Sequence, residues 1–201
     1  MSGIKWLVVF SVAAFASWAQ APVGLTGRWR SAETSTGGLG VMFEFRSDGT
    51  LSFSIGAVVE MKYRIEGNQL IFPPGSTKGP EQHQTMQWVD ADHLLLNGSE
   101  TLSRQGAPHD PADPILGEWT APREIAGVRS EVRFVFEPGG KSLLLFPFKW
   151  QKGRYLVKGS TIRIEYPDAY GPPVEGPFHV EGELLTIPSS GKAGESQLRR
   201  Y

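Results

Sequence analysis

The histidines are the first residues to consider for chemistry, because histidine binds metals and exchanges protons near neutral pH. They are His83, His93, His109 and His179. None has a second ligand at the spacing of a zinc site. Asp92 stands beside His93 and Asp110 beside His109, but neighbouring residues of a strand point to opposite faces. We interpret all the histidines as solvated surface residues.

Other signatures of catalysis are missing from the sequence. There is no serine-nucleophile motif, no glycine-rich phosphate loop leading into a helix, and no carboxylate pair with a defined spacing. The chain has no cysteine, which excludes thiolate metal sites, disulfides and a lipid-modified N-terminus. The sequence therefore predicts a protein without catalytic residues, metal or cofactor. An enzyme whose groups meet only on folding is the alternative.

Aromatic side chains in the second half are the best candidates for ligand binding. Tyr166 and Tyr170 lie in a segment rich in proline and glycine at 165–177, Phe178 follows it, and Trp150 precedes it. Loops on a rigid scaffold commonly carry binding residues, and aromatic rings stack on sugars or cover apolar ligands. The competing interpretation is that Tyr166 and Phe178 complete a core while Tyr170 is a solvent-facing turn residue.

A basic stretch surrounds Trp150 and raises the question of an anionic polymer as partner. Its members are Lys149, Lys152, Arg154, Lys158 and Arg163. The chain as a whole has a formal net charge of −1, so nucleic-acid binding has no overall electrostatic support. We expect this stretch to form a solvated face and predict no nucleic-acid partner.

Short alternating segments indicate the elements that hold these residues. Apolar and polar residues alternate with a period of two in FEF at 43–45, LSF at 51–53 and IRI at 162–164. Turn sequences such as SDG at 47–49 and EGN at 66–68 separate them. No amphipathic helix is evident, so the fold is predicted to be all-β with many short hairpins.

The chain also repeats itself. LTGRW at 25–29 returns as ILGEW at 115–119, and YRIEG at 63–67 returns as YLVKG at 155–159. Similar matches continue along both halves, which indicates a duplication. Each copy holds about eight short strands. In the first copy we predict them at 27–33, 40–46, 50–56, 58–65, 69–72, 84–89, 93–97 and 100–104.

The duplication predicts two domains in tandem. A meander of short strands hides its edges by curling until its first strand meets its last, so each copy is predicted to be a small meander β-barrel. The first would occupy 23–104 and the second 115–201, joined by a proline-rich linker at 105–114. A single barrel or sandwich made from both halves is the alternative.

The Gly-x-Trp motif on the first strand, the meander, and an arginine on the last strand resemble the lipocalin-like (calycin-like) superfamily, here as tandem short bacterial versions. The resemblance implies that each tryptophan closes the floor of its barrel and packs against that arginine. By position, Trp29 would contact Arg104. Trp119 would contact Arg199 or Arg200.

The glycines of the motif, Gly27 and Gly117, fit a tight bend of the chain at each barrel floor. We therefore assign the glycines, tryptophans and arginines of this motif a structural role. Function is expected elsewhere, at the loops where the copies differ.

The sequence is compatible with two functions. One is the binding of a small apolar or amphipathic ligand inside a barrel, in a cavity lined by Phe43, Phe45, Phe134 and Phe136. The other is a structural or protein-interaction module with solidly packed barrels.

The N-terminus predicts export. Lys5 precedes an apolar stretch at 6–16, and Ser17-Trp18-Ala19 has the small residues of a cleavage site, so residues 1–19 are predicted to be a signal peptide. The mature chain would begin near Gln20 and work in the periplasm or outside the cell. An uncleaved membrane anchor is the alternative, although the apolar run is shorter than the roughly 18 to 20 residues that span a bilayer. No membrane span is expected after cleavage.

Overall fold

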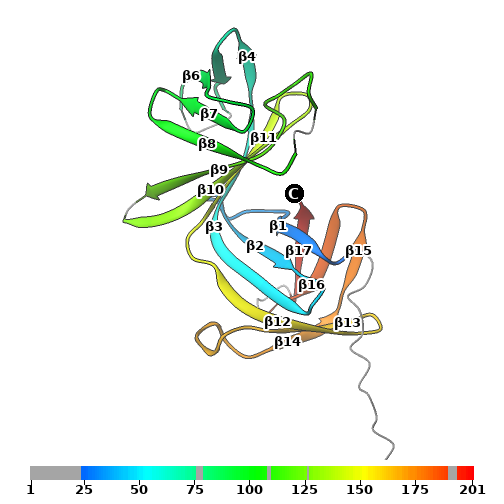
Figure 1. Ribbon diagram of the computed structural model, residues 1–201. Helices are drawn as coiled ribbons and strands as arrows, with labels where there is room; N and C mark the ends of the chain where they lie inside the picture. The colour runs from blue at the N-terminus through cyan, green and yellow to red at the C-terminus, as the bar shows by residue number, and fades with distance from the viewer. Residues whose placement is uncertain (1–23, 76–78, 108–109, 126, 190–193) are drawn as a thin grey trace, which may run out of the picture.

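The computed structural model describes residues 24–75, 79–107, 110–125, 127–189 and 194–201 (Figure 1). The predicted signal peptide, together with Gln20, lies outside these residues. The described chain is all-β and antiparallel, as predicted, with 17 strands and one short 3₁₀ turn, η1 (Asp168–Tyr170). It forms two lobes that meet at a narrow waist (Figure 1).

The strands follow the duplication. Those of the first copy are β1 (Gly27–Ser31), β2 (Leu39–Phe45), β3 (Thr50–Lys62), β4 (Arg64–Glu66), β5 (Gln69–Phe72), β6 (Gln82–Trp88), β7 (His93–Leu96) and β8 (Glu100–Gln105). Those of the second copy are β9 (Gly117–Ile125), β10 (Val128–Glu137), β11 (Lys141–Pro147), β12 (Gln151–Lys158), β13 (Thr161–Glu165), β14 (Val174–Pro177), β15 (His179–Glu181), β16 (Leu184–Pro188) and β17 (Glu195–Arg200). The strands predicted for the first copy lie close to these positions, with one important difference.

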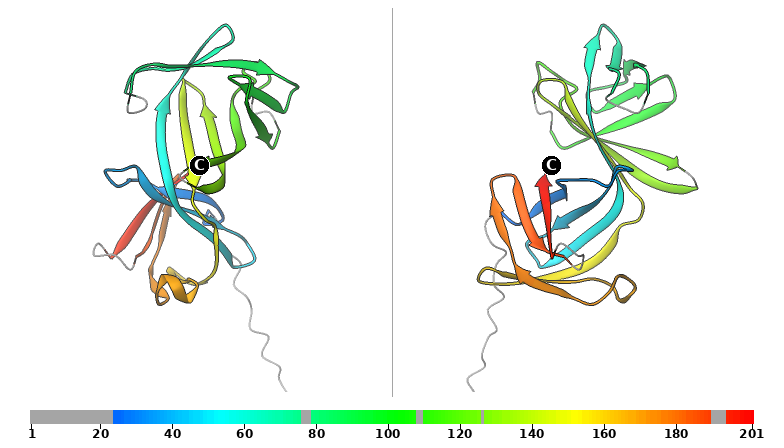
Figure 2. Two further views of the ribbon diagram at one scale, coloured as in Figure 1. Left: turned by 90° about the vertical axis from the view of Figure 1, so that its left-hand side faces the viewer. Right: turned by 180° about the vertical axis from the view of Figure 1, so that it is seen from behind.

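That difference is β3, which is a single strand of 13 residues where two strands, at 50–56 and 58–65, were predicted. Gly56 stands just before Ala57 at the expected break, but it lies within the strand and does not have a positive φ. The chain therefore continues in extended form and runs from one lobe into the other (Figure 2). Its first half pairs with β2, and its second half pairs with β11 of the other copy.

The first lobe holds both ends of the described chain, and we call it the terminal lobe. Its pairings run from β17 to β1, β2 and the first half of β3, and then to β12, β13 and β14. On the other side β17 pairs with β16, and β16 with β15. β14 and β15 stand at the two ends of this pairing order, and only Phe178 separates them in the chain. The sheet therefore curls around one core.

The second lobe, the central lobe, contains the middle of the chain. Its pairings run from the second half of β3 to β11, β10, β9, β8, β7 and β6. Strands β4, β5 and β6 pair in that order and lead back to β3 through Tyr63. Segment 105–114, predicted as an interdomain linker, joins β8 to β9, which are hydrogen-bonded neighbours within this lobe.

The copies have therefore exchanged strands, and the tandem arrangement of one unit per copy is wrong. Residues 23–104 and 115–201 do not each enclose a core of their own. In the terminal lobe, Trp29 and Phe45 from the first copy pack with Ile164 and Leu198 from the second. In the central lobe, Leu94, Leu102, Trp119 and Phe134 show the same mixing.

Glycine permits the crossing of the strands at the waist. Gly56 on β3 is buried against Pro147 of β11, and a Cβ there would stand 2.0 Å from the carbonyl oxygen of Phe146. Any side chain at this position would push the crossing strands apart. A tyrosine in each lobe also joins the two copies by a hydrogen bond. The Tyr63 hydroxyl donates to the Glu137 carbonyl at 3.3 Å, and the Tyr155 hydroxyl donates to the Arg46 carbonyl at 2.5 Å.

Introduced cysteines would test the exchange directly, because the chain has none of its own. Lys62 and Lys141 are directly opposite on β3 and β11. Antiparallel partners have Cα separations of about 4.5 to 5.5 Å, which a disulfide can bridge. We expect the double variant Lys62→Cys and Lys141→Cys to form an intramolecular cross-link on mild oxidation, detected by mass spectrometry of the intact chain.

The control is Lys62→Cys with Lys158→Cys, whose second position lies on β12 of the terminal lobe. It should leave both thiols free. Free thiols in the folded Lys62→Cys and Lys141→Cys protein would contradict the exchange.

Candidate functional site

The motif tryptophans are fully buried, and each is covered by an arginine from a last strand of a copy. The guanidinium carbon of Arg200 lies 4.2 Å from the ring centroid of Trp29, and that of Arg104 lies 4.2 Å from the ring centroid of Trp119. The predicted pairings of Trp29 with Arg104, and of Trp119 with Arg199 or Arg200, are therefore wrong. The motif is kept, but the strand exchange swaps the partners.

Hydrogen bonds complete each stack. Trp29 Nε1 donates to the Leu25 carbonyl at 2.8 Å, and Arg200 donates to the Thr26 carbonyl at 3.0 Å and to the Gly24 carbonyl. Gly27 has a φ of 125°, and a Cβ there would stand 2.6 Å from an Arg200 nitrogen. A larger residue would therefore displace the arginine.

The central lobe repeats these contacts. Trp119 Nε1 donates to the Ile115 carbonyl at 2.8 Å, and Arg104 donates to the Leu116 carbonyl at 3.1 Å and to the Pro114 carbonyl. Gly117 also has a positive φ, of 114°. The structural role assigned to this motif thus has the same physical basis in both lobes.

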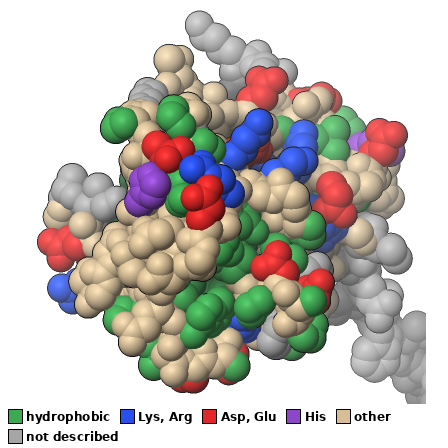
Figure 3. Space-filling model, turned by 90° about the horizontal axis from the view of Figure 1, so that it is seen from above, with side chains coloured by type: hydrophobic (Ala, Val, Ile, Leu, Met, Phe, Trp, Pro, Cys, Tyr) green, Lys and Arg blue, Asp and Glu red, His purple; other side chains and the backbone are tan. Residues whose placement is uncertain are grey.

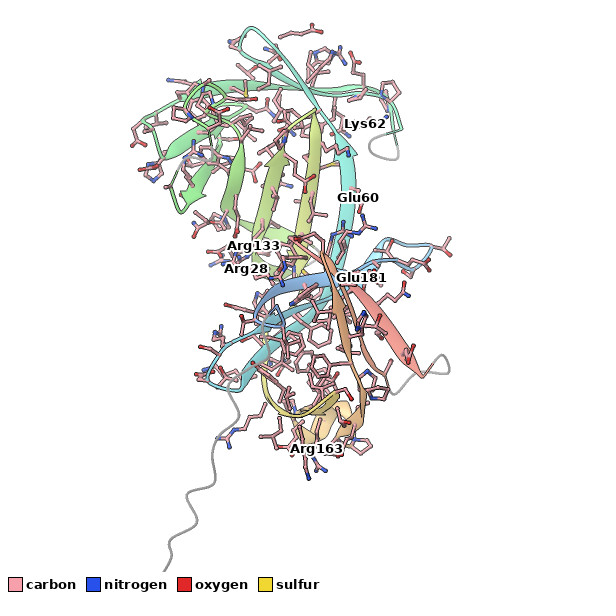
Figure 4. All side chains as sticks on the ribbon, turned by 90° about the vertical axis from the view of Figure 1, so that its right-hand side faces the viewer. Arg28, Glu60, Lys62, Arg133, Arg163 and Glu181 are labelled. Atoms are coloured by element: carbon pink, nitrogen blue, oxygen red, sulfur yellow. The ribbon has the colours of Figure 1, made fainter. Side chains whose placement is uncertain are left out.

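The variable residues of the two motifs meet at the waist. Arg28, the x of the first Gly-x-Trp, makes an ion pair with Glu118, the x of the second. Glu118 also accepts a hydrogen bond from Arg133 Nη1 at 2.6 Å. Arg28 and Arg133 lie together where the lobes join (Figure 4). These partly buried charges help to hold one lobe against the other.

The aromatic residues predicted to bind a ligand fall into two places. Tyr166 and Tyr170 both stand edge-on to Phe53, with ring centroids 5.0 and 5.2 Å away. Tyr166 and Phe178 are half-buried against the terminal core, whereas Tyr170 is 45% exposed. Trp150 instead packs at the waist, beside the cluster that contains Met42 and Leu145.

The phenylalanines expected to line an interior cavity are core residues. Phe43, Phe45, Phe134 and Phe136 are at most 5% exposed. Phe45 stands edge-on to Tyr155 with centroids 5.1 Å apart, and Phe136 stands edge-on to Tyr63 at 5.0 Å. Their rings thus fill space inside the lobes by packing on other rings.

A cleft of about 860 Å³ lies instead between the lobes. Its terminal-lobe wall comes from β1, β17 and the turn before β16. Its central-lobe wall comes from the second half of β3, the segment after β5, the end of β10 and the start of β11. Glu60 and Lys62 mark the β3 side above the waist in Figure 4. The residues that line it include Arg30, Met61, Pro74, Lys141, Leu143, Glu183, Arg199 and Tyr201.

Several buried polar atoms of residues that line this cleft have no hydrogen-bond partner among the described residues. Arg30 Nε, Ser142 Oγ and the Tyr201 hydroxyl all belong to residues that line it. A buried polar group left unpaired costs about 1 to 3 kcal/mol, so such groups mark places where a partner is missing. Burial also raises the pKa of Tyr201 to about 12, although Arg133 and Arg28 nearby act in the opposite direction.

The described residues contain no group of three or more His, Asp or Glu side chains that could hold a metal ion. His83 lies 2.9 Å from Glu81 and His93 lies 2.9 Å from Asp90, but both contacts are on exposed strand surfaces. His179 is exposed on β15, and His109 lies outside the described residues. These contacts bring no histidine and carboxylate together in the cleft.

Sequence reasoning missed the cleft because its walls come from segments far apart in the chain. Its residues belong to no motif, and a repeat analysis treats Arg30 and Arg199 as members of separate domains. The one sequence signal at the crossing is Gly56, which the repeat analysis treated as the end of a strand.

No family model matches the chain, and no curated protein or solved structure compared with it shows significant similarity. Within the described residues no helix has the length and apolar character of a membrane span. Seen from above, the central lobe shows basic and acidic side chains interspersed among apolar ones (Figure 3).

Double-mutant cycles would test the exchanged stacks. We expect Trp29→Leu and Arg200→Ala to show a coupling energy of about 0.5 to 2 kcal/mol, because a partly buried guanidinium lies on the indole face. The free energies of unfolding would come from urea titrations followed by circular dichroism.

The matched cycle pairs Trp29→Leu with Arg104→Ala, whose arginine covers Trp119 in the other lobe. These effects should add to within about 0.5 kcal/mol. Coupling in this second cycle and additivity in the first would overturn the assignment.

Alkaline pH should destabilise the fold. Burial raises the pKa of Tyr201 and of Tyr63 to about 12, above the ordinary tyrosine value of 10.0. Between these values the unfolded chain loses protons that the folded chain keeps, so the free energy of unfolding falls as pH rises from about 10 to 12. Urea titrations across this range should show the fall.

The variant Tyr201→Phe should flatten this dependence, whereas Tyr170→Phe, at an exposed ring, serves as the control. Equal slopes for wild type and Tyr201→Phe would contradict the role of this residue.

Proposed function

We propose that this chain is a non-enzymatic binding protein that takes a small amphipathic ligand in the cleft between its lobes. The observation that carries the proposal is the cleft itself. Its volume of about 860 Å³ falls within the roughly 300 to 1,000 Å³ of typical small-molecule sites. The packed rings of Phe45 and Phe136 favour this site over the lobe interiors.

The chemistry of the walls supports an amphipathic ligand. Pro74 supplies exposed apolar surface and the largely buried Met61 and Leu143 add small apolar areas, while Arg30, Lys141 and other charged residues supply polar contacts. A ligand with one apolar and one polar part would contact both kinds of surface.

We further propose that each lobe is a small lipocalin-like barrel, assembled from halves of both copies. Its support is the curled order of pairings around each core and the arginine stacked on each motif tryptophan. Export to the periplasm or the extracellular medium is likewise proposed, on the pattern of residues 1–19 alone.

A blocking substitution would test the cleft as the binding site. Glu183 lies on its wall with a side chain 72% exposed, so Glu183→Trp should fold and fill part of the space. We expect the affinity for the neutral probe N-phenylnaphthylamine to fall roughly tenfold, a loss of about 1.4 kcal/mol. Probe fluorescence would give the dissociation constant.

The matched control is Glu175→Trp, on β14 beside Arg163 at the far end of the terminal lobe. It should bind the probe like the wild type. Wild-type binding by Glu183→Trp, or no saturable binding by the wild type, would exclude the cleft as the site.

The alternative function, a protein-interaction module, draws on a different feature. Leu39, Ile55 and Phe148 are 42 to 47% exposed, and Phe148 hydrogen-bonds through its backbone to Ile55. Neighbouring exposed apolar residues often mark a contact surface. If they form one, Ile55→Ser should weaken the self-association of the protein in sedimentation velocity. A wild-type protein that is monomeric would exclude self-association as the function of this surface.

A further inference from the structure

Two arginines stand directly opposite each other at the cleft. Arg30 on β1 and Arg199 on β17 are register partners in an antiparallel pair, so their side chains leave the same face of the sheet. Both line the cleft. Like charges in this arrangement repel each other and destabilise the pair. Such a pair becomes favourable when an anion lies between its members.

Arg30 has an unused donor at this place. The residue is only 6% exposed, and its Nη atoms donate to the Ser31 carbonyl at 3.0 Å and to Glu60. Its Nε is buried and has no acceptor. A guanidinium can donate through all of its N–H groups, so Arg30 keeps one N–H without an acceptor among the described residues.

The opposite wall adds positive charge. Lys141, at the start of β11, lines the central-lobe side and is exposed. Within the described part of the chain, neither Lys141 nor Arg199 lies in an ion pair. Lysine and arginine side chains outnumber glutamates along the walls, five to three. A ligand group held here would therefore experience a net positive field.

We propose that the ligand carries an anionic head group, a carboxylate or a phosphate, which binds between Arg30 and Arg199 while Lys141 approaches from the central lobe. This inference rests on the proposed function, because the apolar part of the same ligand would lie against Met61, Leu143 and Pro74. The head group would relieve the repulsion between the arginines.

Isothermal titration calorimetry of the full mature chain with amphiphiles of equal chain length tests the proposal. The probes are dodecanoate, dodecyl phosphate and dodecyltrimethylammonium, each below its micelle concentration, and inorganic phosphate as a head group without a chain. We expect one or both anionic probes to bind at least roughly tenfold more tightly than the cation, as charge-assisted hydrogen bonds require. Comparing the two anions identifies the head group.

Variants separate this site from general charge effects. Arg199→Ala and Lys141→Ala should each weaken binding of the preferred anion roughly five- to tenfold. Arg163→Ala and Lys158→Ala remove the same charges from the terminal lobe outside the cleft and should leave binding unchanged. Thermal unfolding checks the fold, and Arg199→Ala should not lower the midpoint without ligand because it removes a repulsion.

The outcomes distinguish the two proposals. Equal binding of anionic and cationic amphiphiles, or loss of binding in the control variants as much as in Arg199→Ala, overturns the anionic head group and leaves the amphipathic site standing. If inorganic phosphate binds and none of the amphiphiles does, the proposed function is overturned, but the anion site between the arginines stands. No binding of any probe overturns both.

Discussion

The absence of a turn in β3 is the constraint on which the whole structure depends. Thirteen residues in extended form span roughly 40 Å, longer than most strands in globular proteins. Its first half pairs with β2 in the terminal lobe, and its second half pairs with β11 in the central lobe. Gly56 allows the crossing because the carbonyl of Phe146 occupies the space of a side chain. The exchanged partners, the waist and the cleft all follow from this continuous strand.

Duplication and exchange also explain which residues were free to differ. Each lobe needs one tryptophan, one covering arginine and one tyrosine, so these residues recur in both copies. At the waist, the x position of one motif meets the x position of the other. Identical residues there would place like charges together, whereas Arg28 and Glu118 attract each other. Because the two copies belong to one chain, their x positions can differ and carry opposite charges. Two identical chains would have the same residue at both positions.

Much of the local structure was predictable from the sequence, because alternation and turn residues act over short distances. Except for the two strands expected at 50–56 and 58–65, the strands of the first copy and the turns at 47–49 and 66–68 lie close to where the pattern placed them. The choice of partners was not predictable in the same way. Arg104 and Arg200 offer Trp29 the same guanidinium on the same strand position, and nothing local distinguishes them. The cleft was missed for the same reason, since it exists only between lobes that share both copies.

The position of the chain ends has a mechanical consequence. β1 and β17 are antiparallel neighbours, and Trp29 near the start of β1 is paired with Arg200 at the end of β17. A force applied to both ends of the described chain would pull these strands apart from one end, so their hydrogen bonds would break one after another and not together. The terminal lobe would open at low load, and the central lobe would receive tension only through β3 and the β11 to β12 connection. Under this load the described chain would therefore yield first at the terminal lobe.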